Sequence, residues 1–158
     1  MTLTLMEDSQ QLVITLDQIK AHLRLDGDHD NEILTTFIHT ATEMVEGFLG
    51  MTVTNRVWKL VDTPNHEGQI HLPMGPVQEI ISIDKAGPVK IVGDVVHCCI
   101  GTKPVTVIYR AGMTSVPAPV RQAIRVLTGH FYENRLGDLE FPVWVRGMLM
   151  PYRSCCVR

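Results

Sequence analysis

The sequence predicts an α+β fold in which about four helices flank a small antiparallel β-sheet, inserted between the N-terminal and the C-terminal helices. Apolar residues recur at helical spacing before residue 50 and again after residue 117. Between them, residues 51–110 hold short runs of β-branched and aromatic residues separated by Pro, Gly, Asp and Asn. Strands so close in sequence, with no helix between them, are expected to pair as antiparallel neighbours.

The length and composition bound the possible classes of protein. With 158 residues, of which 45% are hydrophobic, the chain can bury one sizeable core. We therefore expect a single domain over residues 1–158, with an inserted subdomain as the alternative. Its segments are a helical hairpin (14–50), a β insertion (51–110), C-terminal helices (117–150) and a tail (151–158).

Charge and hydropathy exclude further classes. The net charge of −3 gives no broad basic face, which argues against tight, sequence-specific DNA binding. The apolar start of the chain is interrupted by Glu7, Asp8 and Ser9, and no run approaches 18 consecutive apolar residues. We expect a soluble, unsecreted protein with no membrane partner.

The first helix is predicted to start after Thr15. Thr15 and Gln18 have the spacing of a capping box, and apolar residues then recur at helical spacing to about Leu25. Residues 1–13 show no such period. We expect them to form an arm that is mobile or becomes ordered on a partner.

The second helix carries the strongest periodic pattern in the chain. A polar turn at residues 26–31 precedes it, and Asp28 or Asp30 is expected to cap it. Gly50 is placed where a glycine commonly ends a helix. Its apolar positions are Ile33, Leu34, Phe37, Ile38, Ala41, Met44, Val45, Phe48 and Leu49.

Six short strands are expected in the β insertion, separated by the turns TPNHEG, LPMGP, KAGP, GD and GTKP. They form a meander, either as a small sheet or as a barrel-like insertion. The predicted strands are Val57–Val61, Gln69–Leu72, Glu79–Ile83, Val89–Ile91, Val95–Ile100 and Val105–Tyr109.

Prolines mark the helices of the last third. Pro117 and Pro119 suit a helix start, Pro142 opens a second short helix, and Pro151 is expected to stop it. Gly129 weakens the longer helix by about 1 kcal/mol relative to Ala. A conformational or close-packing reason for this glycine is therefore expected.

No catalytic residue can be named from the sequence. The serines lack a GxSxG elbow, no His pairs recognisably with a Cys or Ser, and the glycines form no phosphate-binding loop. We expect no enzymatic activity and no cofactor.

The sequence offers two possible metal sites, and neither is expected to bind a metal. Asp26, Asp28 and Asp30 alternate as at the start of a calcium loop, but Asn31 and Phe37 occupy the positions where that loop needs Gly and Glu. A zinc site from His97 with the adjacent Cys98 and Cys99 would need vicinal ligands, which is not the usual spacing.

Several segments together resemble one protein family. These are VTVIYRAGMTSVPAPVRQAIRVLTGHFYENR (105–135), ITLDQIKAHLRLDGDHDNEILTTFI, VEGFLG, LPMGPVQEI and MLMPYR, in this order between Ile14 and Arg153. No single segment is diagnostic, but their combination and spacing are much more specific. The chain is similar to the head–tail connector (adaptor, head-completion) proteins of tailed phages and prophages.

The resemblance implies a helical connector core with an inserted β region, and a structural role in the virion neck. Connectors of this kind form a homo-oligomeric ring, here expected to be a dodecamer, beneath the portal protein. A tail-side neck or stopper protein would be the second partner. DNA would pass through the channel without specific binding, and the protein would be made in the cytoplasm of the bacterial host.

Candidate site residues come from two segments. Two interpretations fit Tyr132, Glu133 and Arg135. They form either an ordinary helix end, where the positive charge of Arg135 interacts favourably with the helix dipole, or a subunit interface, since Tyr and Arg are residue types favoured at interfaces. By position, the resemblance places portal docking at Tyr152, Arg153 and the tail through Arg158. The SCCVR ending is not typical of the family.

Other hypotheses stay open from the sequence. A gene transfer agent or a domesticated prophage particle would use the same protein, and so would another neck or tail-completion component. From a different class comes a small metal- or ligand-binding domain or enzyme, with a pocket in the β insertion near His71, His97 and Cys98.

Overall fold

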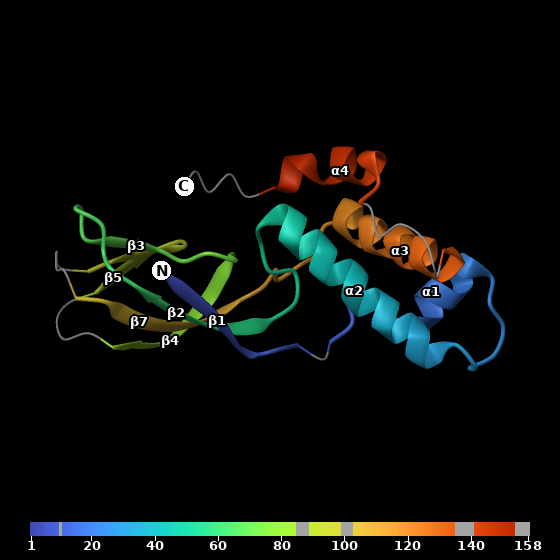
Figure 1. Cartoon of the computed structure of the whole chain (residues 1–158), viewed down its shortest axis with the longest axis horizontal. Coiled ribbons are helices and arrows are strands. Elements are labelled where there is room, and N and C mark those ends of the chain that lie inside the picture. Colours follow the sequence, from blue (N-terminus) through green and yellow to red (C-terminus); the bar gives the residue numbers. More distant parts are fainter. Residues whose placement is uncertain (10, 85–88, 99–102, 135–140, 154–158) are drawn as a thin grey trace. The chain divides into compact units, whose positions relative to one another are not determined.

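The computed structural model describes residues 1–9, 11–84, 89–98, 103–134 and 141–153, and it confirms the α+β class. The described helices are α1 (Leu16–Leu23), α2 (Asn31–Leu49), α3 (Ala118–Glu133), α4 (Val143–Leu149) and a 3₁₀ turn, η1 (Met150–Tyr152) (Figure 1). The described strands are β1 (Thr2–Glu7), β2 (Arg56–Asp62), β3 (Gln69–His71), β4 (Val77–Asp84), β5 (Lys90–Val92), β6 (Val95–His97) and β7 (Val105–Ala111).

The chain divides into two compact units. A β unit combines Met1–Gln10 with Thr54–Met113, and a helical unit combines Gln11–Val53 with Thr114–Arg158. The predicted β insertion therefore needs the N-terminal ten residues as well. The expectation that the chain behaves as a single domain stays a prediction.

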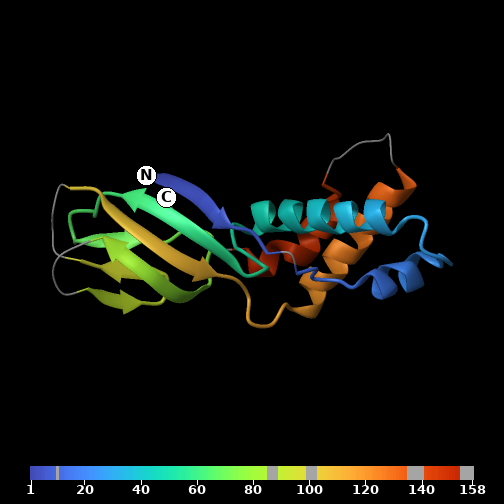
Figure 2. The same ribbon diagram turned by 90° about the horizontal axis from the view of Figure 1, so that it is seen from below.

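Two antiparallel sheets form the β unit. The larger has the strand order β1-β2-β7-β4, and Figure 2 shows these strands side by side in this order. The smaller has the order β3-β6-β5. Since β7 lies between β2 and β4, the strands do not follow chain order as a simple meander would.

Side chains from both sheets share one apolar core. The burial of β7 alternates strictly, with Val105, Val107, Tyr109 and Ala111 buried and the residues between them partly exposed. This alternation follows from the two-residue period of a strand with one covered face. The buried members are Leu60, Ile70, Leu72, Val96, Cys98, Val105, Val107, Tyr109 and Ala111.

The N-terminal segment differs from the prediction. Thr2–Glu7 is a strand that pairs along β2, from Thr2 opposite Val61 to Glu7 opposite Val57. At its end, Asp8 Oδ1 lies 2.7 Å from Nε of Arg56, a side chain that is only 9% exposed. The expected mobile or partner-dependent arm was wrong for these residues, because pairing partners exist within the chain.

The predicted capping box of α1 is confirmed. Thr15 Oγ1 accepts from the Gln18 backbone N–H at 3.3 Å, and Gln18 Oε1 accepts from the Thr15 N–H at 3.4 Å. At the other end Arg24 adopts the left-handed conformation (φ 55°), and its N–H bonds the Lys20 carbonyl.

The N-terminal end of α2 differs from the prediction, and its C-terminal end agrees with it. Asp30 is the N-cap residue, but its side chain makes no capping bond, and neither does Asp28. Gly50 ends the helix in the left-handed conformation, as expected (φ 66°). The buried Glu46 then accepts from the Val53 N–H at 2.7 Å, which fixes the chain as it leaves the helix.

Close packing explains Gly129 of α3. A Cβ at this position would lie 3.3 Å from Leu23 Cδ2 of α1, so a side chain would crowd the contact between the two helices. Farther along, Pro142 precedes α4 as predicted. The α-helix ends at Leu149, two residues before Pro151, and the 3₁₀ turn η1 then contains this proline.

Candidate functional site

The predicted interface cluster lies at the C-terminal end of α3, in the helical unit. Tyr132 is half-buried, and its hydroxyl donates to Asp30 Oδ2 at 2.6 Å, which joins α3 to the start of α2. Glu133 is exposed. Arg135 lies outside the described residues. The structure thus separates two neighbours by role: Tyr132 holds the helices together, and Glu133 is free to meet solvent or a partner.

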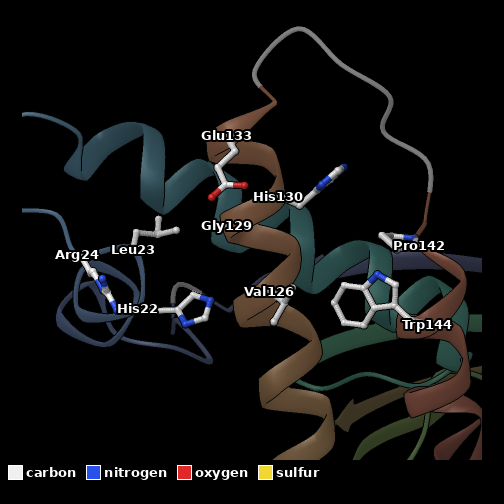
Figure 3. A pocket seen from close by; sticks show the side chains of 9 residues that line it. All are labelled: His22, Leu23, Arg24, Val126, Gly129, His130, Glu133, Pro142 and Trp144. Carbon is white, nitrogen blue, oxygen red and sulfur yellow. The ribbon is translucent and has the colours of Figure 1, made fainter.

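Glu133 lines a hollow in the helical unit. Figure 3 shows side chains from three elements around it, including His22 and Leu23 of α1, Val126 of α3 and Trp144 of α4. The hollow has a volume of about 420 Å³. Its lining also includes Arg24, Gly129, His130 and Pro142, so it combines apolar, basic and acidic groups.

Trp144 is a surface residue that the sequence analysis placed only within a short apolar helix. Its exposed fraction is 52%, and that of Val143 beside it is 82%. Exposed aromatic side chains beside a hollow are typical of protein interfaces. The signal was present in the sequence: Val145 and Leu149, one turn apart, are the buried pair of α4, and Trp144 lies off that line.

The predicted docking residues near the C-terminus are partly engaged within the chain. The Arg153 guanidinium carbon lies 5.5 Å from the ring centroid of Phe48, and that ring stacks on Phe141 at 5.2 Å. Arg153 is exposed and Tyr152 is half-buried. Arg158 lies outside the described residues. The described end of the chain is therefore anchored on α2 through an aromatic pair.

Two carboxylates of the acidic turn before α2 accept hydrogen bonds from other residues of the helical unit. Asp28 Oδ1 accepts from Lys20 Nζ at 2.6 Å and from Asn31 Nδ2 at 3.1 Å. The Lys20 hydrogen bond, followed by that of Asn31, lowers the pKa of Asp28 below its ordinary value. Asp30 binds Tyr132.

The residues of the alternative pocket are not brought together. Cys98 is buried in the apolar core of the β unit. In the β3–β6 pair, the burial pattern places Ile70 and Val96 on the core side, and His71 and His97 on the other side. Cys99 lies outside the described residues. Among the residues that are described, no group of three or more His, Cys, Asp or Glu side chains could hold a metal ion.

Within the described part of the chain, every helix is too short or too polar to cross a membrane.

The sequence matches a known family over part of its length. Residues 13–86, a little less than half of the chain, match the model of the phage gp6-like head-tail connector proteins. The match spans α1, α2, β2, β3 and β4, and it leaves out β1. The predicted resemblance to this family is thereby confirmed over these residues. No curated protein sequence matches the chain significantly.

The fold matches solved structures over the whole chain. One is a chain from the neck of an empty gene transfer agent particle computed with C6 symmetry, with a TM-score of 0.85 and 18% identity. A chain from the virion of a native gene transfer agent particle gives 0.83 and 19%, and one from the neck of a native particle computed with C12 symmetry gives 0.80 and 17%. Each match covers 100% of this chain and 98% of the other. At these identities the likeness establishes the fold.

Proposed function

We propose that this chain is a structural head–tail connector protein, of the family whose gp6-like model matches residues 13–86. That match is the observation that carries the proposal. The agreement of the whole fold with chains from the neck and the virion of a gene transfer agent particle supports it. The role is one of geometry and docking, without catalysis.

In this role the chain forms a homo-oligomeric ring of twelve copies in the virion neck. Chains of the same fold occur in particle necks that were computed with C6 and C12 symmetry, and this supports a ring. Closed cyclic symmetry makes the contact between neighbours heterologous, so one face of each subunit must fit a different face of the next. Glu133, with Arg135, is our first candidate for this contact.

The ring joins the portal protein on the capsid side to a neck or stopper protein on the tail side. Tyr152 and Arg153, with Arg158, are the candidate portal contacts. The protein is made in the cytoplasm of the bacterial host. DNA passes through the channel without specific binding. The net charge of −3 supports this, since each phosphate that the protein neutralised would strengthen its salt-dependent binding to the duplex.

Mass photometry and negative-stain microscopy of the purified chain test the proposal, with and without the portal protein of the same particle. We expect rings, or portal particles that gain one added layer of density. A chain that forms no ring in either preparation and leaves the portal unchanged would contradict the proposal.

A further inference from the structure

We infer that neighbouring subunits meet through an arginine groove on one copy and a seam on α2 of the next copy. The inference rests on the proposed function, because it names the interface of that ring. The arginine groove is lined by Ala118, Pro119, Arg121, Gln122, Arg125 and Met148, from α3 and α4. The α2 seam consists of the exposed residues Thr36, Glu43 and Gly47.

The arginine groove carries positive charge that the described chain does not neutralise. Arg121 and Arg125 lie one helical turn apart on the same side of α3. Arg125 Nη1 donates to Gln122 Oε1 at 3.1 Å, while its Nε is buried without a hydrogen-bond partner among the described residues. Neither arginine makes an ion pair with a described residue. Such a groove is suited to an acidic side chain.

Apolar groups surround these charges. Met148, Ala118 and Pro119 share the groove, which has a volume of about 630 Å³. Arginine beside Met and other apolar groups is typical of the centre of a protein interface. The guanidinium groups are thus placed where a docked protein would remove them from water and strengthen their ion pairs.

The α2 seam has small side chains and one central acid. Its positions follow one line along the helix, opposite the buried stripe that includes Leu34, Ile38 and Val45. The Thr36 hydroxyl bonds the Glu32 carbonyl at 3.1 Å, so its polar group is satisfied within the helix. Glu43 is exposed and makes no ion pair with a described residue.

Gly47 is an independent indication that another backbone approaches this seam. A Cβ at this position would meet nothing within 4 Å, so no contact within the described chain requires a glycine. Glycine in a helix costs about 1 kcal/mol relative to Ala. Close approach of a neighbouring chain is a physical reason for a glycine that has none within its own fold.

The two faces complement each other in charge. Glu43 has the small Thr36 and Gly47 on neighbouring turns, so its carboxylate can reach between Arg121 and Arg125 of the next copy. The faces belong to different helices of the same unit, as a heterologous contact needs. A second copy fits better than DNA, because the apolar lining would desolvate phosphates without replacing their bonds to water.

Charge exchange tests the pairing. We expect Glu43→Arg and Arg121→Glu, made separately, each to raise the concentration at which rings form by about ten-fold or more, with or without portal protein. Both residues are exposed, and circular dichroism would check that the variants are folded. Mixed one to one, the two variants should form alternating rings, because every junction then pairs opposite charges.

Two matched controls change the charge elsewhere on the same helices. Glu32→Arg lies 11 residues before Glu43, about 16 Å away along α2. Arg146→Glu alters an exposed arginine of α4 that does not line the groove. Both controls should assemble as the wild type does.

The outcomes separate the inference from the proposed function. Single variants that assemble normally, or a mixture that is not rescued, would overturn the inference and leave the connector role standing. Arg121→Glu rings that form normally but retain less DNA would assign the groove to the nucleic acid and would also overturn it. A wild-type chain that forms no ring, alone or with the portal, would overturn both.

Discussion

At the scale of single residues, polar side chains fix the ends of the helices. Tyr132 and Asp30 lie 102 positions apart in the sequence, and their hydrogen bond joins the end of α3 to the start of α2. Glu46, buried in α2, accepts from the backbone N–H of Val53 just beyond the helix. Both bonds connect segments that local sequence patterns treat separately. The sequence predicted Tyr132 as part of either a helix end or a subunit interface, and it did not predict the bond to Asp30.

Removing the Tyr132 hydroxyl should destabilise the helical unit. We expect Tyr132→Phe to lower the free energy of unfolding by about 1–2 kcal/mol, because the half-buried Asp30 carboxylate loses a donor. Urea denaturation followed by circular dichroism measures this. Tyr152→Phe is the matched control, since the Tyr152 hydroxyl makes no hydrogen bond to a residue that the structure describes. Equal effects of the two changes would argue against the Asp30 bond.

Glu46 should matter more than its exposed neighbour. Glu46→Ala leaves the Val53 N–H unsatisfied in a buried place, and we expect a loss of about 2–3 kcal/mol in the free energy of unfolding. Glu43→Ala, one turn earlier and exposed, should change it by less than about 0.5 kcal/mol. Thermal unfolding of the isolated subunit would compare the two, and a small effect at Glu46 would contradict the assignment.

At the scale of elements, two glycines in helices have opposite surroundings. Gly129 of α3 is buried against Leu23 of α1, whereas the site of a Cβ on Gly47 of α2 is open. From the sequence, a conformational or close-packing reason was predicted for Gly129 only. The packing of α3 on α1 explains Gly129, whereas no contact within the described chain explains Gly47.

Substitutions at these glycines should therefore have opposite signs. We expect Gly129→Val to destabilise the subunit by about 1–3 kcal/mol, because the branched side chain would overpack the contact with α1. Gly47→Ala should stabilise it by about 0.5–1 kcal/mol, through higher helix propensity. Chemical denaturation gives both values, and destabilisation by both would show that Gly47 is packed more closely than the structure indicates.

The sequence was most informative where signals are local. The capping box at Thr15, the glycine stop at Gly50 and the alternating strand at residues 105–109 were all predicted correctly. The strand β1 was missed, because its partner β2 lies some fifty residues away and a short edge strand carries little periodicity. For the same reason, the hollow beside Glu133 could not be derived from spacing alone, because its lining comes from α1, α3 and α4.

At the scale of the whole molecule, the two units have separate interiors. The β unit buries its own cluster around Tyr109, and the helical unit packs α2 on α3, where the rings of Phe37 and Phe131 lie 6.2 Å apart. The chain passes between the units at residues 10–11, 53–54 and 113–114.

Loss of the Arg56 side chain should act within the β unit. Arg56→Ala removes the ion pair with Asp8, and we expect faster hydrogen exchange in β1 and β2, with α3 unchanged. Hydrogen exchange followed by mass spectrometry resolves these segments. Lys59→Ala on the same strand, which has no ion pair with a described residue, is the control. Equal acceleration in α3 would show that both units open together, as one cooperative domain.

The strand β1 also limits how this gene can change by recombination. An exchange that replaced residues 54–113 with the corresponding segment of another gene would import a new β2 but keep the old β1. The pairing of Thr2 with Val61 and of Glu7 with Val57, and the ion pair of Asp8 with Arg56, would then have to be re-established between segments of different origin. Viable hybrids should therefore inherit both segments from one parent.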